Sequence, residues 1–442
     1  MVSQFLNEII KNNQKIKINI LSFAFYYMMF FLLFSGLIGF RVVWHISIVI
    51  LGVYMLCKYP QYIRSFSYSL SGKFFIISLV LVVMSLLTTG GNDVFFLMTN
   101  IRSLAYSFFV LVIMMIVVER KNELVFELFE EHILFFNILL IINMIVVAFQ
   151  AQGTGMFMRQ EWLEGGQYID QVAGLFGDSS TPHLGLFTVL VMLINLSYAR
   201  RHMQRYLKAI FWGYTFLMMT LMGILSKYND NTGYYIIMPM FLILYSLYTT
   251  NMLTKYRSTR ILKNIGYVVI GVFVFVLFIN LPAIREIRET YVDVRIYSLL
   301  NYQAVGVTGS NTRLFQIYYG LTHDFGWLLG KGFATAELTC IEAHGFKFFG
   351  NCSMAGFVIL GGVWLFLAYT MMYTNCLYDM VRGEEKKSVV LFFTVFVVLV
   401  IFSLYKPTYN DARTVLFICL YALLFNHLLK GKIDSSFIRV KM

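Results

Sequence analysis

Residues 133–151 read ILFFNILLIINMIVVAFQA, an apolar stretch without a charged side chain. An α-helix rises about 1.5 Å per residue, so about 20 apolar residues cross the hydrocarbon core of a bilayer. Similar stretches recur along the 442-residue chain, of which 59% is hydrophobic and 13% is charged. This composition excludes an ordinary soluble domain and predicts an all-α polytopic membrane protein.

The length rule predicts about twelve transmembrane helices. Only one proline, Pro239, falls inside a predicted span, so the sequence does not indicate broken substrate-binding helices. Residues 58–73, KYPQYIRSFSYSLSGK, are interpreted as a loop, and they lack the Gly-Asp-Arg-Gly-Arg pattern of major-facilitator transporters. The predicted spans lie at residues 18–40, 42–58, 74–90, 103–119, 133–151, 184–199, 209–226, 234–252, 265–283, 355–377, 389–405 and 414–430.

Charge gives this topology an orientation. Most of the 35 Lys and Arg residues lie in short loops on the side of the two termini. The positive-inside rule therefore places both termini in the cytoplasm. Because orientation in the bilayer accounts for the net charge of +12, nucleic-acid binding is not expected.

The predicted topology divides the chain into three parts. Residues 1–283 hold nine spans and an outer loop at 152–183, residues 284–354 form a large outer loop, and residues 355–442 hold three spans and a cytoplasmic tail. A long insertion between spans costs conformational entropy and usually carries function. We therefore expect the chemistry of this protein in the large outer loop.

The large loop begins with an amphipathic pattern. Ile284, Ile287 and Tyr291 fall on one helical face, which predicts a helix lying on the membrane surface. Arg285 and Arg288 alternate with glutamates and are expected to form its solvated face.

Three motifs occur in order on the predicted outer side. The first is GLFGDSSTPHLGLFTVLVML, residues 174–193, where an outer loop enters a span. The second is Arg313, followed after sixteen residues by Gly330-Lys331-Gly332, and the third is His344 ahead of a glycine-containing span. In this order and placement the chain resembles the Wzy-type O-antigen and capsular polysaccharide polymerases, which are related to the O-antigen ligases. The Gly345 that follows His344 favours a polymerase over a ligase.

The resemblance implies a glycosyltransferase with a GT-C-like membrane fold in the cell inner (cytoplasmic) membrane. Such an enzyme transfers a growing glycan from undecaprenyl diphosphate to an incoming lipid-linked repeat unit. Its expected partners are therefore the undecaprenyl-diphosphate-linked donor and acceptor, membrane lipid, and a chain-length regulator of the Wzz co-polymerase type. An O-antigen ligase and a lipid-linked oligosaccharide flippase are the alternatives.

The leaving diphosphate needs positive charge, and the sequence offers no metal-binding motif, so neither a metal nor another cofactor is expected. Arginine binds phosphate in a bidentate manner and keeps its charge. Under the resemblance, Arg313, Arg295 and His344 are the expected catalytic residues. Glu342, Glu161 and Asp178 are, with His344, the candidate bases for the acceptor hydroxyl. The expected substrate-binding residues are Arg159, Asp178, His183, Gly330, Lys331 and Gly332.

Overall fold

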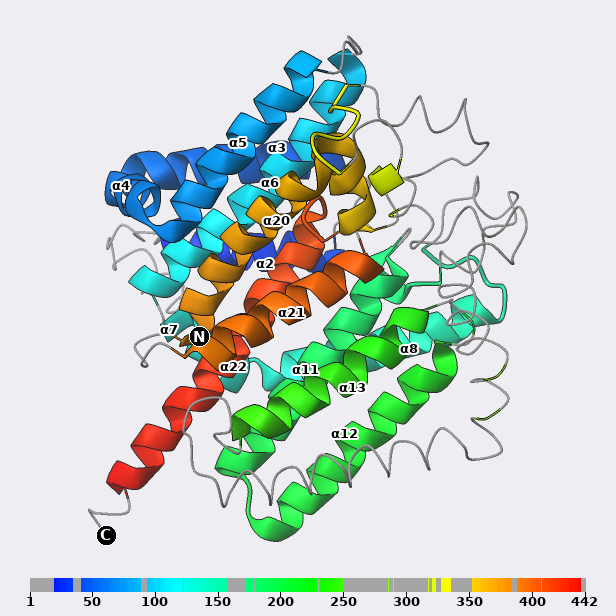
Figure 1. The fold of residues 1–442 in the computed structure, drawn as a ribbon. Helices are drawn as coiled ribbons and strands as arrows, with labels where there is room; N and C mark the ends of the chain where they lie inside the picture. The colour runs from blue at the N-terminus through cyan, green and yellow to red at the C-terminus, as the bar shows by residue number, and fades with distance from the viewer. Residues whose placement is uncertain are drawn as a thin grey trace, which may run out of the picture.

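The computed structural model describes residues 20–34, 41–88, 94–121, 123–157, 172–177, 180–226, 231–249, 327–334, 352–382, 388–406 and 408–438, with short pieces at 228, 285, 289, 317 and 320–322. Over these residues the chain is helical and has no β-strand. Figure 1 shows the long helices gathered into one bundle. The all-α architecture expected from composition is confirmed for this part of the chain.

Each predicted span except 265–283, which lies outside the described residues, contains a helix. A 3₁₀ turn, η1 (Gly174–Phe176), precedes α11. The α-helices are α2 (Ile20–Phe34), α3 (Arg41–Lys58), α4 (Pro60–Tyr68), α5 (Leu70–Thr88), α6 (Val94–Arg120), α7 (Glu123–Glu130), α8 (Ile133–Ala151), α11 (Thr181–His202), α12 (Arg205–Leu225), α13 (Thr232–Thr249), α20 (Ser353–Arg382), α21 (Val389–Tyr405) and α22 (Ala412–Ile438).

Several of these helices are suited to a bilayer. Within the described residues, six are long and apolar enough to cross a membrane: α5, α6, α8, α11, α12 and α20. The number rises to seven if α3 and α4, which meet at an 88° bend, form one span. Shorter apolar segments occupy α2, α13, α21 and α22. The chain is thus an α-helical membrane protein, and the number twelve stays a prediction.

Helix α4 differs from the sequence-based interpretation, in which residues 58–73 form a loop. Pro60 stands at the first turn of α4, where its missing N–H costs nothing and its fixed φ favours a helix. Tyr62 is buried while Ile63 is exposed, so the short helix is amphipathic. The loop interpretation was therefore wrong for this segment.

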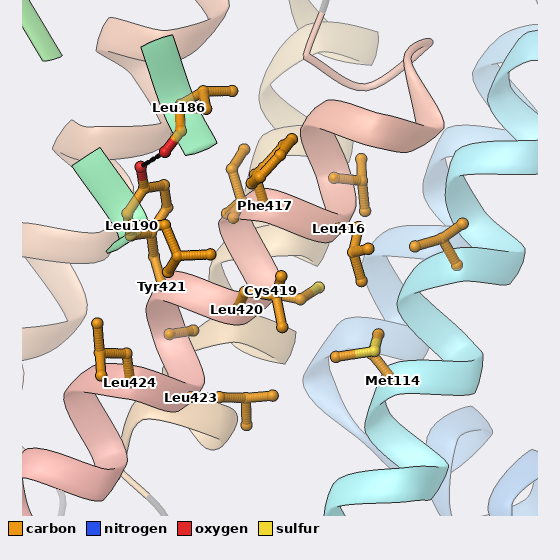
Figure 2. Close-up of a cluster of buried hydrophobic side chains, with 14 of the residues drawn as sticks. Met114, Leu186, Leu190, Leu416, Phe417, Cys419, Leu420, Tyr421, Leu423 and Leu424 are labelled. Carbon is orange, nitrogen blue, oxygen red and sulfur yellow. Dashed lines mark hydrogen bonds between the residues drawn. The ribbon is translucent and has the colours of Figure 1, made fainter. Parts of the chain in front are cut away.

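Helix α11 is the centre of the bundle. Its apolar window is 89% buried within the protein, against 22% for α5 and for α12. Neighbouring helices rather than lipid therefore cover most of the surface of α11. Helix α22 runs beside it, and the Tyr421 hydroxyl donates a hydrogen bond of 2.5 Å to the Leu186 carbonyl. Figure 2 shows α22 packed between α11 and the Met114 face of α6.

Polar side chains also join the helices inside the bundle. Asn137 of α8 and Asn195 of α11 exchange two hydrogen bonds, of 2.7 and 2.8 Å. The Tyr214 hydroxyl of α12 donates to Asn137 Oδ1 at 3.1 Å. Such bonds between helices satisfy amides that apolar surroundings could not. They fix α8, α11 and α12 relative to one another.

Candidate functional site at one end of the bundle

The structure describes four of the residues that the sequence marks as candidates. They are His183, Gly330, Lys331 and Gly332. The remaining candidates, Arg159, Asp178, Arg295, Arg313 and His344, lie outside the described residues, and so do Glu161 and Glu342. In the large loop, Arg285 donates to Glu289 at 2.7 Å with both side chains exposed, as expected for a solvated helix face.

His183, at the first turn of α11, pairs with an acidic residue far away in the sequence. Its Nε2 lies 2.6 Å from Oδ2 of Asp411, which immediately precedes α22. His183 is buried, and its ring stacks on Phe417 with centroids 6.4 Å apart. The imidazole thus enters a contact between helices rather than capping its own helix.

Asp411 is held from several directions. The Thr414 hydroxyl donates to Oδ2 at 2.7 Å, and the backbone N–H of Arg413 donates to Oδ1 at 3.2 Å. A carboxylate at this position satisfies free N–H groups at the start of α22. Its side chain remains 24% exposed.

Two cations surround the His183–Asp411 pair. Arg413 Nη1 donates to Ser180 Oγ at 2.7 Å and to the Phe176 carbonyl at 3.5 Å. Lys406, at the end of α21, is buried. Burial raises the pKa of the Asp411 carboxyl, but His183, Arg413 and Lys406 outweigh this effect and hold its pKa well below the usual range. Asp411 is therefore ionised in the folded protein.

The charge on Asp411 determines the tautomer that we assign to His183. An ionised carboxylate only accepts hydrogen bonds, so Nε2 carries the ring proton and Nδ1 keeps its lone pair. Nδ1 is buried and has no hydrogen-bond partner in the described part of the chain. The pair therefore leaves Nδ1 with a lone pair that no described residue uses.

An irregular segment lies against this cluster. Residues 172–177 pack among α2, α8 and α11, with Phe176 buried. Side chains of α8 bind its backbone: Asn143 Oδ1 accepts from the Leu175 N–H and Gln150 Oε1 from the Gly174 N–H, both at 2.8 Å. Irregular backbone at membrane depth is tolerated where protein groups satisfy it. The segment thereby places the Phe176 carbonyl beside Arg413.

The Gly330–Gly332 segment fits into a break in α20. Gly362 has φ +79° and ψ 176°, which interrupts the helix. The Lys331 N–H donates to the Ile359 carbonyl at 2.5 Å, and Ser85 Oγ donates to the Leu360 carbonyl at 2.8 Å. These two bonds satisfy carbonyls near the break. The predicted span 355–377 is thus interrupted at Gly362, although no proline marks the break.

Backbone approaches backbone at this break. A Cβ added at Gly330 would lie 2.4 Å from the Ile359 carbonyl oxygen, and one at Gly362 would lie 2.3 Å from the Leu328 carbonyl oxygen. Both glycines also have positive φ, a conformation that other residues rarely adopt. Gly330 therefore serves close packing against α20.

The start of α20 connects the His183–Asp411 cluster with the break at Gly362. Ser353 Oγ accepts from the Thr408 N–H at 2.5 Å and from the Tyr409 N–H at 3.0 Å, and the Ser353 N–H donates to the Lys406 carbonyl at 2.9 Å. The connection that carries Lys406 and Asp411 is thus anchored to α20. Ile359, which binds the Lys331 N–H, is about two helical turns further along α20.

The sequence interpretation missed Asp411, Arg413, Thr414 and Lys406. The available signal was KPTYNDAR, residues 406–413, a polar stretch between two predicted spans on the predicted outer side. Charged residues next to or within spans often mark functional sites. The partner of Asp411 could not be inferred, because His183 is 228 positions away.

A second polar cluster lies at the other end of α11. Glu130, at the end of α7, lies 2.9 Å from Arg201 Nη1, 2.5 Å from His202 Nε2 and 2.7 Å from His427 Nε2. Burial raises the pKa of the Glu130 carboxyl, but His427, His202 and Arg201 produce a net lowering. From His183 to Arg201 the helix rises about 27 Å, close to the thickness of a hydrocarbon core. The two clusters therefore bracket the apolar part of α11.

No family model matches the chain, and no curated protein matches it either. Within the described residues, no group of three or more His, Cys, Asp and Glu side chains could hold a metal ion. The candidate site is therefore judged on its own geometry.

Proposed function

We propose that this protein is a glycosyltransferase that polymerises undecaprenyl-diphosphate-linked oligosaccharide repeat units at the outer face of the cytoplasmic membrane. The observation that carries the proposal is the His183–Asp411 pair, set between Arg413 and Lys406 at one end of an apolar helix bundle. Glycosyl transfer from a lipid diphosphate needs a base and cations at such a position. Both termini are then cytoplasmic.

His183 is the proposed base. Asp411 holds the imidazole with its proton on Nε2, and Nδ1 accepts the proton of the acceptor hydroxyl. The acceptor oxygen forms a bond to the anomeric carbon of the donor while the bond from that carbon to the diphosphate breaks. Asp411 stabilises the imidazolium that forms, as a carboxylate does in a catalytic triad.

The cations stabilise the leaving group. Negative charge grows on the diphosphate as the glycosidic bond breaks, and preorganised donors aimed at that charge lower the barrier. Arg413 and Lys406 supply positive charge at the described end of the site, and the proposal assigns the same task to Arg313 and Arg295 of the large loop. His344 is retained as a catalytic candidate, and Arg159 and Asp178 as substrate-binding candidates.

The test is a polymerisation assay with purified protein and lipid-linked repeat units. A polymerase produces a ladder of glycan lengths from this single substrate. A ligase consumes donor only when a separate acceptor is added, and a flippase leaves glycan length unchanged. A complete absence of longer products from folded protein would refute the proposal.

Two variants connect the assay to the site. His183→Gln removes the base and should reduce the ladder by about two to four orders of magnitude, the usual contribution of general-base catalysis. His202→Gln is the matched control, because His202 belongs to the Glu130 cluster at the opposite end of α11. Equal ladders from both variants would remove His183 from the mechanism.

A second candidate function, a lipid-linked oligosaccharide flippase, is favoured by one observation. Helix α20 is broken at Gly362, and broken helices form binding sites in many secondary transporters. In the described residues, however, the break is filled by the 327–334 segment, whose backbone satisfies it. Transport of a fluorescent lipid-linked oligosaccharide across vesicles, without growth of the glycan, would support this alternative.

A further inference from the structure

Helix α4 turns away from the span that precedes it. It meets α3 at an 88° bend, and Figure 1 shows it at the edge of the bundle. Helix α3 has 18 residues and rises about 27 Å by itself, close to the thickness of a hydrocarbon core. The chain then enters α5, which is another candidate span. Because α3 and α5 can each cross the membrane without α4, the bend at the end of α3 places α4 along the membrane surface.

Contacts with two spans hold α4 in this position. The ring of Phe66 packs against Phe75 of α5 and Phe108 of α6, with centroids 6.0 and 6.1 Å apart. The Phe66 carbonyl oxygen also lies so near α5 that a Cβ added at Gly72 would come within 2.0 Å of it. Tyr62, one turn before Phe66, is buried as well. One side of α4 is thus fixed to the bundle.

The remaining surface of α4 carries the residue types of an interfacial helix. Ile63 is 51% exposed and Tyr68 is 76% exposed. Arg64 is exposed too, and at 3.6 residues per turn it lies about 160° around the helix from the buried Tyr62. Apolar, aromatic and basic side chains on one short amphipathic helix are typical of helices at the boundary between headgroups and acyl chains.

The surface around α4 is positively charged. Lys58 ends α3, Lys73 lies in the first turn of α5, and Arg120 ends α6. Residues 41–88 contain no Asp or Glu, and Glu119 offsets the neighbouring Arg120. In the described part of the chain, no carboxylate forms an ion pair with Lys58, Arg64 or Lys73. These three cations therefore leave the surface net positive.

Tyr59, between α3 and α4, brings two of the cations together. Lys58 Nζ lies 5.9 Å from the centroid of its ring, and Arg120 Cζ lies 5.6 Å from it. An aromatic face attracts cations without using their N–H donors. Both side chains thus stay beside α4 and keep donors for an anionic group.

We propose that α4 lies in the membrane interface and binds the phosphate groups of anionic phospholipids, in the leaflet at the end of the bundle where α3 ends. Ile63 contacts the acyl chains, and Lys58, Arg64 and Lys73 bind the phosphates. A zwitterionic phospholipid also presents a phosphate, but its positive amine is repelled by these cations. This binding surface is independent of the proposed glycosyl transfer, because α6 leads from it directly to α7 and the Glu130 cluster, away from the His183–Asp411 pair.

The experiment uses the full-length protein in vesicles of phosphatidylglycerol and phosphatidylcholine, with a photoactivatable diazirine near the glycerol of one lipid at a time. Mass spectrometry then compares how strongly each lipid labels residues 59–73. Phosphatidylglycerol should label this segment preferentially, and added salt should reduce the preference. Arg64→Gln and Lys73→Gln should each lower the labelling ratio about fivefold, the contribution of one basic residue near an anionic surface.

Two controls separate charge from structure. Arg205→Gln removes an exposed cation at the start of α12, at the end of the bundle that holds Arg201, and should keep the wild-type labelling ratio. Arg64→Lys keeps the charge and should also keep the ratio. A ratio that falls equally in Arg64→Lys and Arg64→Gln would overturn the charge-based recognition.

Other results would overturn the proposal as well. Equal labelling by the two lipids would exclude a preference for anionic headgroups, and a preference that survives both glutamine changes together would exclude the cations as its cause. Stronger labelling of α4 by a probe with its diazirine at the chain end would place the helix in the hydrocarbon core. No labelling by either lipid would show that water or protein covers this surface.

Discussion

Gly330→Ala tests the contact between the 327–334 segment and the break in α20. Gly330 has φ +70°, and an added Cβ would lie 2.4 Å from the Ile359 carbonyl oxygen and 2.7 Å from the Gly361 nitrogen. The positive φ costs a non-glycine residue about 1–2 kcal/mol. Displacing packed backbone costs about 1–3 kcal/mol more, as overpacking does in cores. We expect the free energy of unfolding to fall by about 2–5 kcal/mol, the sum of these two costs.

Two other glycines separate these contributions. Gly153 has φ +90° and nothing within 4 Å of an added Cβ, so Gly153→Ala should cost only the backbone strain of about 1–2 kcal/mol. Gly213 lies within α12 without positive φ and also has open space, so Gly213→Ala should be neutral or stabilise by up to about 1 kcal/mol.

The assay is denaturant-induced unfolding of the three purified variants in one mild detergent, followed by tryptophan fluorescence. The expected order of stability is Gly213→Ala, then Gly153→Ala, then Gly330→Ala. If Gly330→Ala loses no more stability than Gly153→Ala, the segment does not press against α20, and the packing explanation of Gly330 fails.

Three further predictions follow from the site and the bundle. Folding lowers the pKa of Asp411, so its carboxylate stabilises the folded protein fully above the unfolded pKa of about 3.9, and this stabilisation is lost as pH falls below that value. In a plot of thermal midpoint against pH, Asp411→Asn should therefore flatten the decline at acid pH. Asn137→Leu should lower the free energy of unfolding by about 1–3 kcal/mol, because it leaves the Asn195 amide without its partner. Changing both Asn137 and Asn195 to leucine should recover most of this stability in thermal unfolding. A double variant as unstable as the single one would contradict the prediction. Arg313→Lys should slow turnover by about 2–3 kcal/mol in activation free energy, judged by glycan ladders at matched expression, with Arg288→Ala as the near-silent control; a normal ladder would show that a point charge suffices.

The positions of most helices follow from local composition. The predicted spans 133–151 and 389–405 coincide with α8 and α21, because the absence of water forces a long apolar run to satisfy its own backbone as a helix. The prediction of a single continuous span for α20 failed. Its break at Gly362 depends on Lys331 and Ser85, whose bonds to the carbonyls of Ile359 and Leu360 arise from distant parts of the chain.

The candidate site also combines residues that the sequence singled out with residues that only tertiary contacts reveal. The sequence singled out His183 through its place at the start of a span, and it singled out Gly330 and Gly332 through their spacing. It gave Gly330 and Gly332 a substrate-binding role, which stays a prediction; both glycines have positive φ, and Gly330 lies against the backbone of α20. The sequence did not single out Asp411, because a lone carboxylate between two spans does not show that His183 is its partner.

The sequence by itself determined that this chain is an α-helical membrane protein and where nearly all of its described helices lie, because hydropathy and backbone satisfaction act within a single stretch of residues. Only the tertiary structure decided that α11 and α22 lie side by side. That packing brings His183 to Asp411 at one end of the bundle and Arg201 to His427 at the other. Contacts between residues more than two hundred positions apart depend on how helices pack against one another. The hydrophobic pattern of one helix shows which of its faces is buried, but not which other helix covers that face.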